Sequence, residues 1–188
     1  MSQQELLKYV VEILEAAGIA YMLTGSTVSS MQGQPRTTHD IDIVVALGRE
    51  AIPALLAAFA PPRFYLEEAA IRDAIANGTT FNAIDSEGGD EIDFWMLKPD
   101  PFEQAAFRRR YRETAAGISM YLPQPEDTIL SKLRWAKALG GSEKQLGDCV
   151  AVYEVNYTNL DMAYLKQWAG KLGVGHLLAR VQAEAQTD

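Results

Sequence analysis

One segment, residues 39–46, constrains the fold of this chain more than any other part of the sequence. Its apolar and polar residues alternate, which is the two-residue period of a β-strand with one face in the core. The apolar face carries Ile41, Ile43 and Val45, and the opposite face carries Asp40, Asp42 and Val44. We therefore expect an internal strand that presents two carboxylates on the side away from the core.

Asp40 and Asp42 have a direct chemical use. The rise of about 3.3 Å per residue places their Cα atoms roughly 6–7 Å apart on one side of the strand. Carboxylates so placed suit hard divalent cations, which take oxygen ligands, and two-metal phosphoryl chemistry needs such a site. An Asp-x-Asp pair also occurs on solvated strand faces and protected sheet edges. The apolar neighbours favour the metal interpretation, because like charges on an internal strand repel unless a cation neutralises them.

The periodicity of the remaining chain predicts an α+β fold, with a mixed β-sheet flanked by helices in residues 1–122 and a C-terminal helical region in residues 123–188. The first region contains expected helices at 6–17, 28–31, 52–59 and 70–76 and expected strands at 19–23, 63–66, 79–84, 91–97, 110–112 and 118–122. The second contains expected helices at 126–139, 142–155, 160–172 and 174–185. Ser142 with Gln145 three residues later has the pattern of a capping box.

A third acid is expected from the strand at 91–97. Glu91, Asp93 and Trp95 share one face of this strand by the two-residue period. Asp93 is placed to complete the metal site, although Glu91 lies on the same face and competes for the role. Trp95 is expected to serve packing, like Trp135 and Trp168.

Gly25 and Ser26 form the second part of the expected site, beside the acids. A strand that ends in Gly-Ser and opens a helix presents backbone N–H groups and a hydroxyl, which suit a phosphate. Glycine lets the backbone approach the anion closely. By itself Gly-Ser is more often a turn followed by a helix cap.

Taken together, these features resemble a known signature. The stretch LTGSTVSSMQGQPRTTHDIDIVV, residues 23–45, resembles that of the DNA polymerase β-like nucleotidyltransferases, with 13 residues between Ser26 and Asp40. Residues 36–42, RTTHDID, further resemble the AbiEii-like toxin branch and related minimal nucleotidyltransferases. Members of the superfamily carry an apolar strand, Gly-Ser, a short helical spacer and Asp-x-Asp on the next strand.

The resemblance implies a role for each site residue. Asp40 and Asp42 would bind Mg²⁺, with two ions expected and Mn²⁺ as the alternative. Asp93 would be the third, catalytic acid, either as a metal ligand or as the group that accepts the proton of the attacking hydroxyl. Gly25 and Ser26 would hold the phosphates of an NTP substrate. The expected reaction is transfer of a nucleoside monophosphate to a hydroxyl.

Further basic residues are candidates for phosphate contacts. Arg36 lies in the loop before the aspartates. The Pro125-Glu126-Asp127…Lys132-Leu133 pattern resembles the start of the family's helical segment, so Lys132 either reaches the triphosphate or is a solvated lysine. Asp148 is expected to pair with Lys144, one helical turn away. The basic cluster of Lys98, Arg108, Arg109, Arg110 and Arg112 either contacts phosphates or protects a strand edge. His39 and His176 are expected to be structural or surface residues.

Charge and composition bound the partners. The formal net charge is −8, which disfavours an extended nucleic-acid footprint but not a single nucleotide. The acceptor is RNA, protein or a small molecule, with RNA slightly favoured because of toxin-like relatives, and a cognate toxin or antitoxin is a candidate partner. No apolar run is long enough to span a membrane, and the lone Cys149 and the absence of a signal-peptide profile favour the cytoplasm.

Two other functions are compatible with the same residues. A non-catalytic antitoxin, regulator or scaffold with this fold would bind nucleotide weakly. A structural cation site in an unrelated α/β domain would prefer calcium and ignore nucleotides. The presence of all three acids favours the enzyme.

Overall fold

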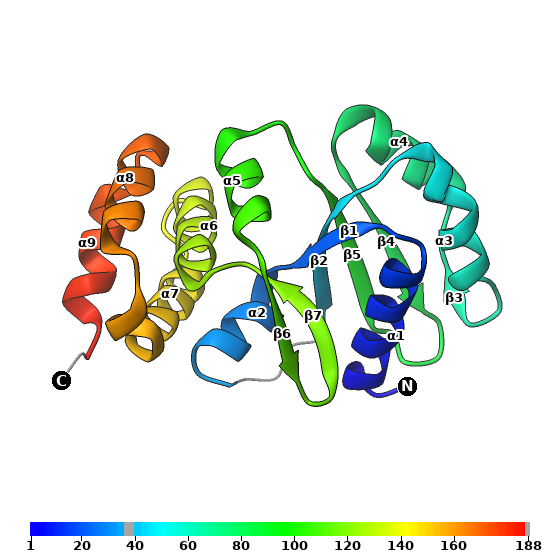
Figure 1. The fold of residues 1–188 in the computed structure, drawn as a ribbon, viewed down its shortest axis with the longest axis horizontal. Coiled ribbons are helices and arrows are strands. Elements are labelled where there is room, and N and C mark those ends of the chain that lie inside the picture. Colours follow the sequence, from blue (N-terminus) through cyan, green and yellow to red (C-terminus); the bar gives the residue numbers. More distant parts are fainter. Residues whose placement is uncertain (36–39, 187–188) are drawn as a thin grey trace. The chain divides into compact units, whose positions relative to one another are not determined.

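The computed structural model describes residues 1–35 and 40–186 of the chain, whose course is shown in Figure 1. These residues form two compact units. The first contains residues 1–27 and the described residues from 40 to 122, and the second contains residues 28–35 and 123–186. Arg36 and His39 lie outside the described residues.

The first unit is built on a mixed sheet of five strands in the order β1-β2-β5-β4-β3. β2 runs parallel to β5, whereas the other neighbouring pairs are antiparallel. The expected internal strand is confirmed, because β2 lies between β1 and β5. The strands are β1 (Ala20–Leu23), β2 (Asp40–Ala46), β3 (Phe64–Tyr65), β4 (Thr80–Asp85) and β5 (Glu91–Met96).

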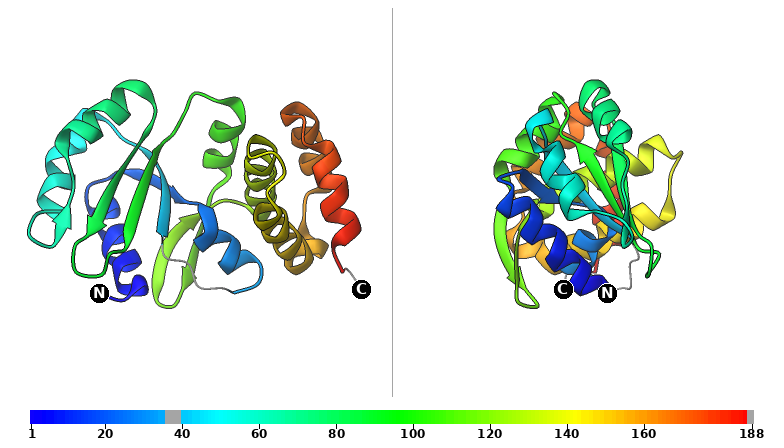
Figure 2. Two further views of the ribbon diagram at one scale, coloured as in Figure 1. Left: turned by 180° about the vertical axis from the view of Figure 1, so that it is seen from behind. Right: turned by 90° about the vertical axis from the view of Figure 1, so that its right-hand side faces the viewer.

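Helices and a separate hairpin complete this unit. α1 lies in front of the sheet in Figure 1 and behind it in the left view of Figure 2. The helices are α1 (Gln3–Ala16), α3 (Ile52–Ala58), which follows a 3-10 turn η1 (Arg49–Ala51), α4 (Glu68–Asn77) and α5 (Pro101–Arg109). The hairpin consists of β6 (Tyr111–Ala115) and β7 (Ile118–Leu122). An α+β fold with a mixed sheet flanked by helices is therefore confirmed.

One face of the sheet is packed by aromatic rings. Phe94 of β5 is fully buried and stacks on Phe81 of β4, with 4.8 Å between ring centroids. Phe59, at the end of α3, meets Phe94 edge-on, and Tyr9 of α1 stacks on Phe64 of β3. Because side chains alternate along each strand, this packing commits the other residues of β2 and β5 to the opposite face.

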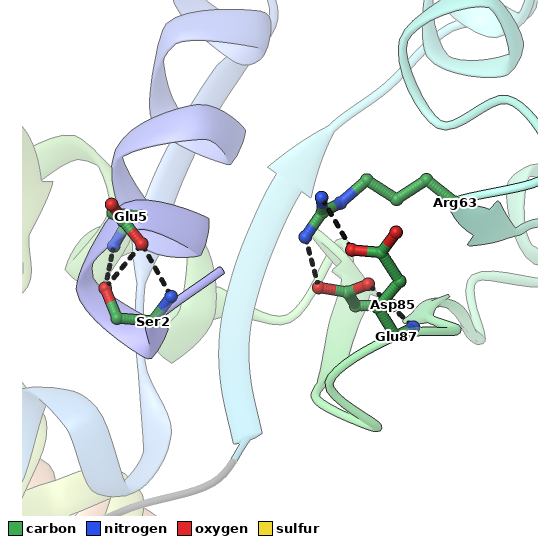
Figure 3. A network of polar contacts seen from close by, with 5 residues as sticks. All are labelled: Ser2, Glu5, Arg63, Asp85 and Glu87. Carbon is green, nitrogen blue, oxygen red and sulfur yellow. Dashed lines mark hydrogen bonds and ion pairs between the residues drawn. The ribbon is translucent and has the colours of Figure 1, made fainter.

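A buried carboxylate on the packed face is neutralised within the same unit. Asp85 is completely buried, and Arg63 forms an ion pair with it at 2.9 Å and a second one with Glu87 (Figure 3). Burial raises the pKa of Asp85, but hydrogen bonds from the Glu87 backbone N–H and from Arg63 outweigh burial, and the pKa lies below its ordinary value. Asp85 is thus a structural acid.

The beginnings of two helices show how local signals set their bounds. α1 starts with a capping box between Ser2 and Glu5 (Figure 3). α5 starts at Pro101, and the Asp100 side chain accepts hydrogen bonds from two backbone N–H groups of its first turn. The sequence analysis missed α5, although Asp-Pro is a recognised start signal. Arg108 and Arg109 lie in the last turn of this helix, before the expected strand at 110–112.

The second unit is helical. It contains the end of α2 (Gly25–Gln32), followed by α6 (Pro125–Ala138), α7 (Glu143–Asn156), a 3-10 turn η2 (Tyr157–Asn159), α8 (Met162–Leu172) and α9 (Gly175–Glu184). These agree with the expected helices to within a few residues. The predicted capping box at Ser142 is wrong, because its side chain forms no cap hydrogen bond. Within the described part of the chain, no helix is both long and apolar enough to cross a membrane.

Candidate active site

Two rows of acids lie side by side on the face of the sheet opposite the aromatic core. In the parallel register of β2 and β5, Asp40 is paired with Glu91 and Asp42 with Asp93. Paired residues on neighbouring strands are about 4.8 Å apart and point to the same side of the sheet. The register therefore brings Asp93 beside Asp42, although the two residues are 51 positions apart in the sequence.

The environment of these acids separates the roles of Asp93 and Glu91. Asn82 of β4 donates a hydrogen bond from Nδ2 to Glu91 Oε1. Desolvation, together with the negative charges of Glu91, Asp42 and Asp40, raises the pKa of Asp93 to about 6. Glu91 already has a partner on β4, whereas Asp93 carries the electrostatic cost of the cluster. Of the two competitors, Asp93 is the better candidate for the third acid.

The fit of this cluster to a divalent cation rests on its donor chemistry. Aspartate oxygens are the ligands that Mg²⁺ and Mn²⁺ prefer, and a cation would relieve the repulsion that raises the pKa of Asp93. Over residues 1–35 and 40–186, no three His, Cys, Asp or Glu side chains are already gathered as a metal-binding group. The acids are neighbours on one face, and a cation would have to draw them together.

Gly25 brings the start of α2 against the same cluster. It has a positive φ of 68°, and a Cβ atom at this position would collide with Asp42 Oδ2 and lie 2.6 Å from Asp42 Cγ. The Thr24 backbone N–H donates to Asp42 O at 2.9 Å, and Thr27 Oγ1 donates to Asp40 O at 3.3 Å. α2 thus begins at Gly25, three residues earlier than expected, and Ser26 lies in its first turn.

Trp95 forms a contact with the acidic cluster that was not expected from the sequence. Its indole Nε1–H donates to Asp42 Oδ1 at 3.1 Å. The alternation of β5 already placed Trp95 on the acidic face, but a general preference of tryptophan for packing outweighed that signal. Trp135, expected to pack, is instead 49% exposed.

Lys132 belongs to a buried polar network of the helical unit. Its ammonium group donates to Asp148 Oδ2 at 2.6 Å and to Gln145 Oε1 at 3.2 Å, and only 7% of its side chain is exposed. Ser29 of α2 also donates to Asp148 Oδ2. The alternative that Lys132 is a solvated lysine is therefore wrong. Asp148 pairs with Lys132 and not with Lys144, the partner expected from the sequence.

Two members of the basic cluster, Arg110 and Arg112, make packing contacts near the hairpin. Arg110 lies over Phe107 with 4.0 Å to the ring centroid, and its Nη1 donates to the carbonyl of Phe107. Arg112 forms an ion pair with Glu15 and also lies over Tyr121. These contacts favour a structural role for both arginines. His176 is exposed, in agreement with the expected surface position.

A first prediction concerns the close approach of Gly25 to Asp42. Gly25→Ala should weaken Mn²⁺ binding by at least about tenfold, because the added methyl group displaces the Asp42 carboxylate. Gly78→Ala is the matched control, since Gly78 has a similar φ of 64° but no described atom within 4 Å of an added Cβ. Both variants should lose about 1–2 kcal/mol of stability from the strained φ. Equal Mn²⁺ affinity of both variants, measured by calorimetry, would contradict the prediction.

A second prediction follows from the raised pKa of Asp93. The folded-state pKa of about 6 exceeds the ordinary value of 3.8, so the folded protein holds a proton that the unfolded chain has lost. Stability should therefore fall as pH rises from about 4 to about 6. Asp93→Asn removes this penalty, worth about 1 kcal/mol after allowance for solvent screening, and should raise the Tm at pH 7.5 by about 2–4 °C.

Thermal melts in EDTA test the Asp93→Asn prediction, with Asp73→Asn on the exposed face of α4 as the control. The advantage of Asp93→Asn should disappear below about pH 4, where Asp93 becomes protonated in both the folded and the unfolded protein. Addition of Mg²⁺ should stabilise the unaltered protein more than the variant. A Tm at pH 7.5 that does not change on Asp93→Asn substitution would show that burial and the neighbouring acids do not penalise the ionised Asp93.

Comparisons with known proteins agree on the fold. No protein-family model matches the sequence, and no curated protein sequence matches it. Among solved structures, an antigenic nucleotidyltransferase-like protein from Paracoccidioides brasiliensis superposes with a TM-score of 0.59 at 16% identity, covering 97% of this chain and 93% of that one. ANT(2'')-Ia in complex with adenylyl-2''-tobramycin gives 0.61 at 13% identity, covering 94% and 99%.

A further similar structure is the lincosamide antibiotic adenylyltransferase LnuA with bound lincomycin. Its TM-score is 0.54 at 15% identity, and the match covers 82% of this chain and 98% of that one. At these identities the likeness concerns the fold alone. The chain has the polymerase β-like fold of nucleotidyltransferase-like proteins.

Proposed function

We propose that this protein is a Mg²⁺-dependent nucleotidyltransferase that transfers a nucleoside monophosphate from an NTP to a hydroxyl group. The observation that carries the proposal is the register of β2 and β5, which sets Asp42 beside Asp93. The start of α2, at Gly25, lies against the same carboxylate of Asp42. Acids and a phosphate-sized turn are thus combined on one face of the sheet.

The reaction divides among these residues as follows. Asp40, Asp42 and Asp93 would hold the cations, two Mg²⁺ or alternatively Mn²⁺, which when bound supply positive charge to the triphosphate and activate the acceptor. The acceptor oxygen forms a bond to the α-phosphorus while the bond to the bridging oxygen breaks, and pyrophosphate leaves. Asp93 would either ligate a cation or accept the proton of the attacking hydroxyl.

Phosphate binding is assigned to the start of α2 and to two basic side chains, those of Arg36 and Lys132. Backbone N–H groups at a helix start attract anions, so Gly25 and Ser26 are proposed to bind the β- and γ-phosphates. Arg36, in the segment before β2, remains a proposed phosphate contact. Lys132 is proposed as a further contact, which would require its ammonium to exchange part of its bonding to Asp148 for the nucleotide.

For the acceptor we now rank a small molecule with a hydroxyl group ahead of RNA and protein. The net charge of −8 opposes a polyanionic acceptor. Two solved structures with the same fold contain small-molecule antibiotics, adenylyl-2''-tobramycin and lincomycin. The toxin-like role and a cognate toxin or antitoxin partner rest on the motif at residues 23–45 and are the second choice. A cytoplasmic location is compatible with either acceptor, because NTPs and Mg²⁺ are available there.

A transfer assay tests the proposal. The protein is incubated with each of the four α-labelled NTPs, Mg²⁺ and three acceptor pools: hydroxyl-rich antibiotics, transfer RNA and total protein. We expect a mass gain of one nucleoside monophosphate on one acceptor, with release of pyrophosphate. Asp42→Asn should abolish labelling, because it removes a charged ligand while preserving side-chain shape.

The same assay separates the enzyme from its main alternative. A non-catalytic regulator with this fold would leave label on no acceptor, with or without Asp42. A cation site unrelated to nucleotides would bind Ca²⁺ and show no change in affinity when NTP is added. Either outcome would refute the proposed transfer reaction.

A further inference from the structure

The two oxygens of the Asp42 carboxylate have different surroundings. Oδ1 accepts the hydrogen bond from the Trp95 indole at 3.1 Å. Oδ2 is the atom that comes closest to the position of a Cβ on Gly25. The carboxylate is therefore held with one oxygen toward β5 and the other toward the first residue of α2.

The strand register explains how Trp95 reaches Asp42. Asp42 is paired with Asp93, and Val44 is paired with Trp95. Trp95 is thus the diagonal neighbour of Asp42 across the β2–β5 pair, on the same face of the sheet. Diagonal neighbours are about 7–8 Å apart, a separation that an aromatic side chain can bridge.

The chemistry of indole restricts what Trp95 can do there. Its Nε1–H is a donor only, so Trp95 can neither bind a cation through this atom nor act as a base. A hydrogen bond to an ionised carboxylate is stronger than one between neutral groups, and it favours the charged, ligand form of the acid. Groups that orient a ligand in this way affect metal affinity almost as much as the ligands themselves.

We propose that Trp95 is a positioning residue for the metal site. It holds Oδ1 of Asp42 so that Oδ2 faces the start of α2, where the nucleotide phosphates are proposed to lie. The inference rests on the proposed function, since it assigns Trp95 a role toward the cation that Asp42 would bind. It differs from a packing role, in which the ring fills space and the N–H group contributes nothing.

Trp95→Phe distinguishes the two roles, because phenylalanine keeps an aromatic ring on β5 and removes the donor. We expect this variant to bind Mn²⁺ about 10- to 100-fold more weakly than the unaltered protein, measured by calorimetry without nucleotide. Trp168→Phe makes the same chemical change in α8 of the helical unit and should leave Mn²⁺ affinity unchanged. A thermal melt of each variant establishes that it is folded.

The indole N–H resonances give a second readout that does not depend on the stability of Trp95→Phe. The chain has three tryptophans, and the Trp95 signal is the one missing from the spectrum of Trp95→Phe. If Trp95 donates to Asp42, then Asp42→Ala moves this signal in metal-free protein. Mg²⁺ should shift the Trp95 signal, and paramagnetic Mn²⁺ should broaden it.

Each result decides the inference. Unchanged Mn²⁺ affinity of Trp95→Phe, or a Trp95 signal that ignores both Asp42→Ala and Mg²⁺, would overturn the positioning role while leaving the proposed function intact. Failure of the unaltered protein to bind Mn²⁺ would overturn both. Weaker Mn²⁺ binding in Trp95→Phe but not in Trp168→Phe would support the role of Trp95. The predicted change of the Trp95 indole signal on Asp42→Ala substitution and on Mg²⁺ addition would support it as well.

Discussion

Repulsion among carboxylates on one face of a sheet is the constraint on which the rest of the proposed site depends. Asp40 and Asp42 on β2 stand beside Glu91 and Asp93 on β5, with the aromatic core fixed to the other side of the same strands. The sheet cannot relieve this repulsion by turning the acids away, because a turn would bury them among Phe94, Phe81 and Ile41. The fold thus maintains a concentration of negative charge that a divalent cation would neutralise.

The neighbours of the acids divide their roles. Asn82 holds Glu91, Trp95 holds Asp42, and Gly25 brings the backbone of α2 against the same aspartate. Burial, together with the negative charges of Glu91, Asp42 and Asp40, raises the pKa of Asp93. Glu91 and Asp42 are thus each held by a hydrogen bond, whereas Asp93 is the acid with the raised pKa.

α2 contributes residues to both units of the chain. Its first turn is bonded to the backbone of β2 through Thr27. Its last turn belongs to the second unit, where the Gln32 side chain donates to Pro123 O and accepts from Thr128. Ser29 also joins the Lys132–Asp148 pair. Within each unit, the residues that α2 contributes are therefore held by hydrogen bonds of that same unit.

The sequence predicted the parts of the site that depend on periodicity within a single element. The alternation in residues 39–46 identified both the core face of β2 and its two aspartates, and the alternation in residues 91–97 placed Asp93 on one face of its strand. Contacts that depend on the register between strands cannot be predicted from the periodicity of a single element. The hydrogen bond of Trp95 requires β5 to be aligned with β2 to within one residue, and the Gly25–Asp42 approach requires the exact start of α2. Asp148 found its partner in Lys132, 16 residues away on another helix, because burial favours the closest cation over the helical neighbour.

The most direct measurement of the central claim is the anomalous diffraction of crystals soaked in Mn²⁺ and a non-hydrolysable NTP. The account predicts an anomalous peak within about 2.0–2.3 Å of carboxylate oxygens of both Asp42 and Asp93, with phosphate oxygens completing the coordination. A peak bound elsewhere, or nucleotide density remote from Gly25 with the four acids unmoved, would contradict it.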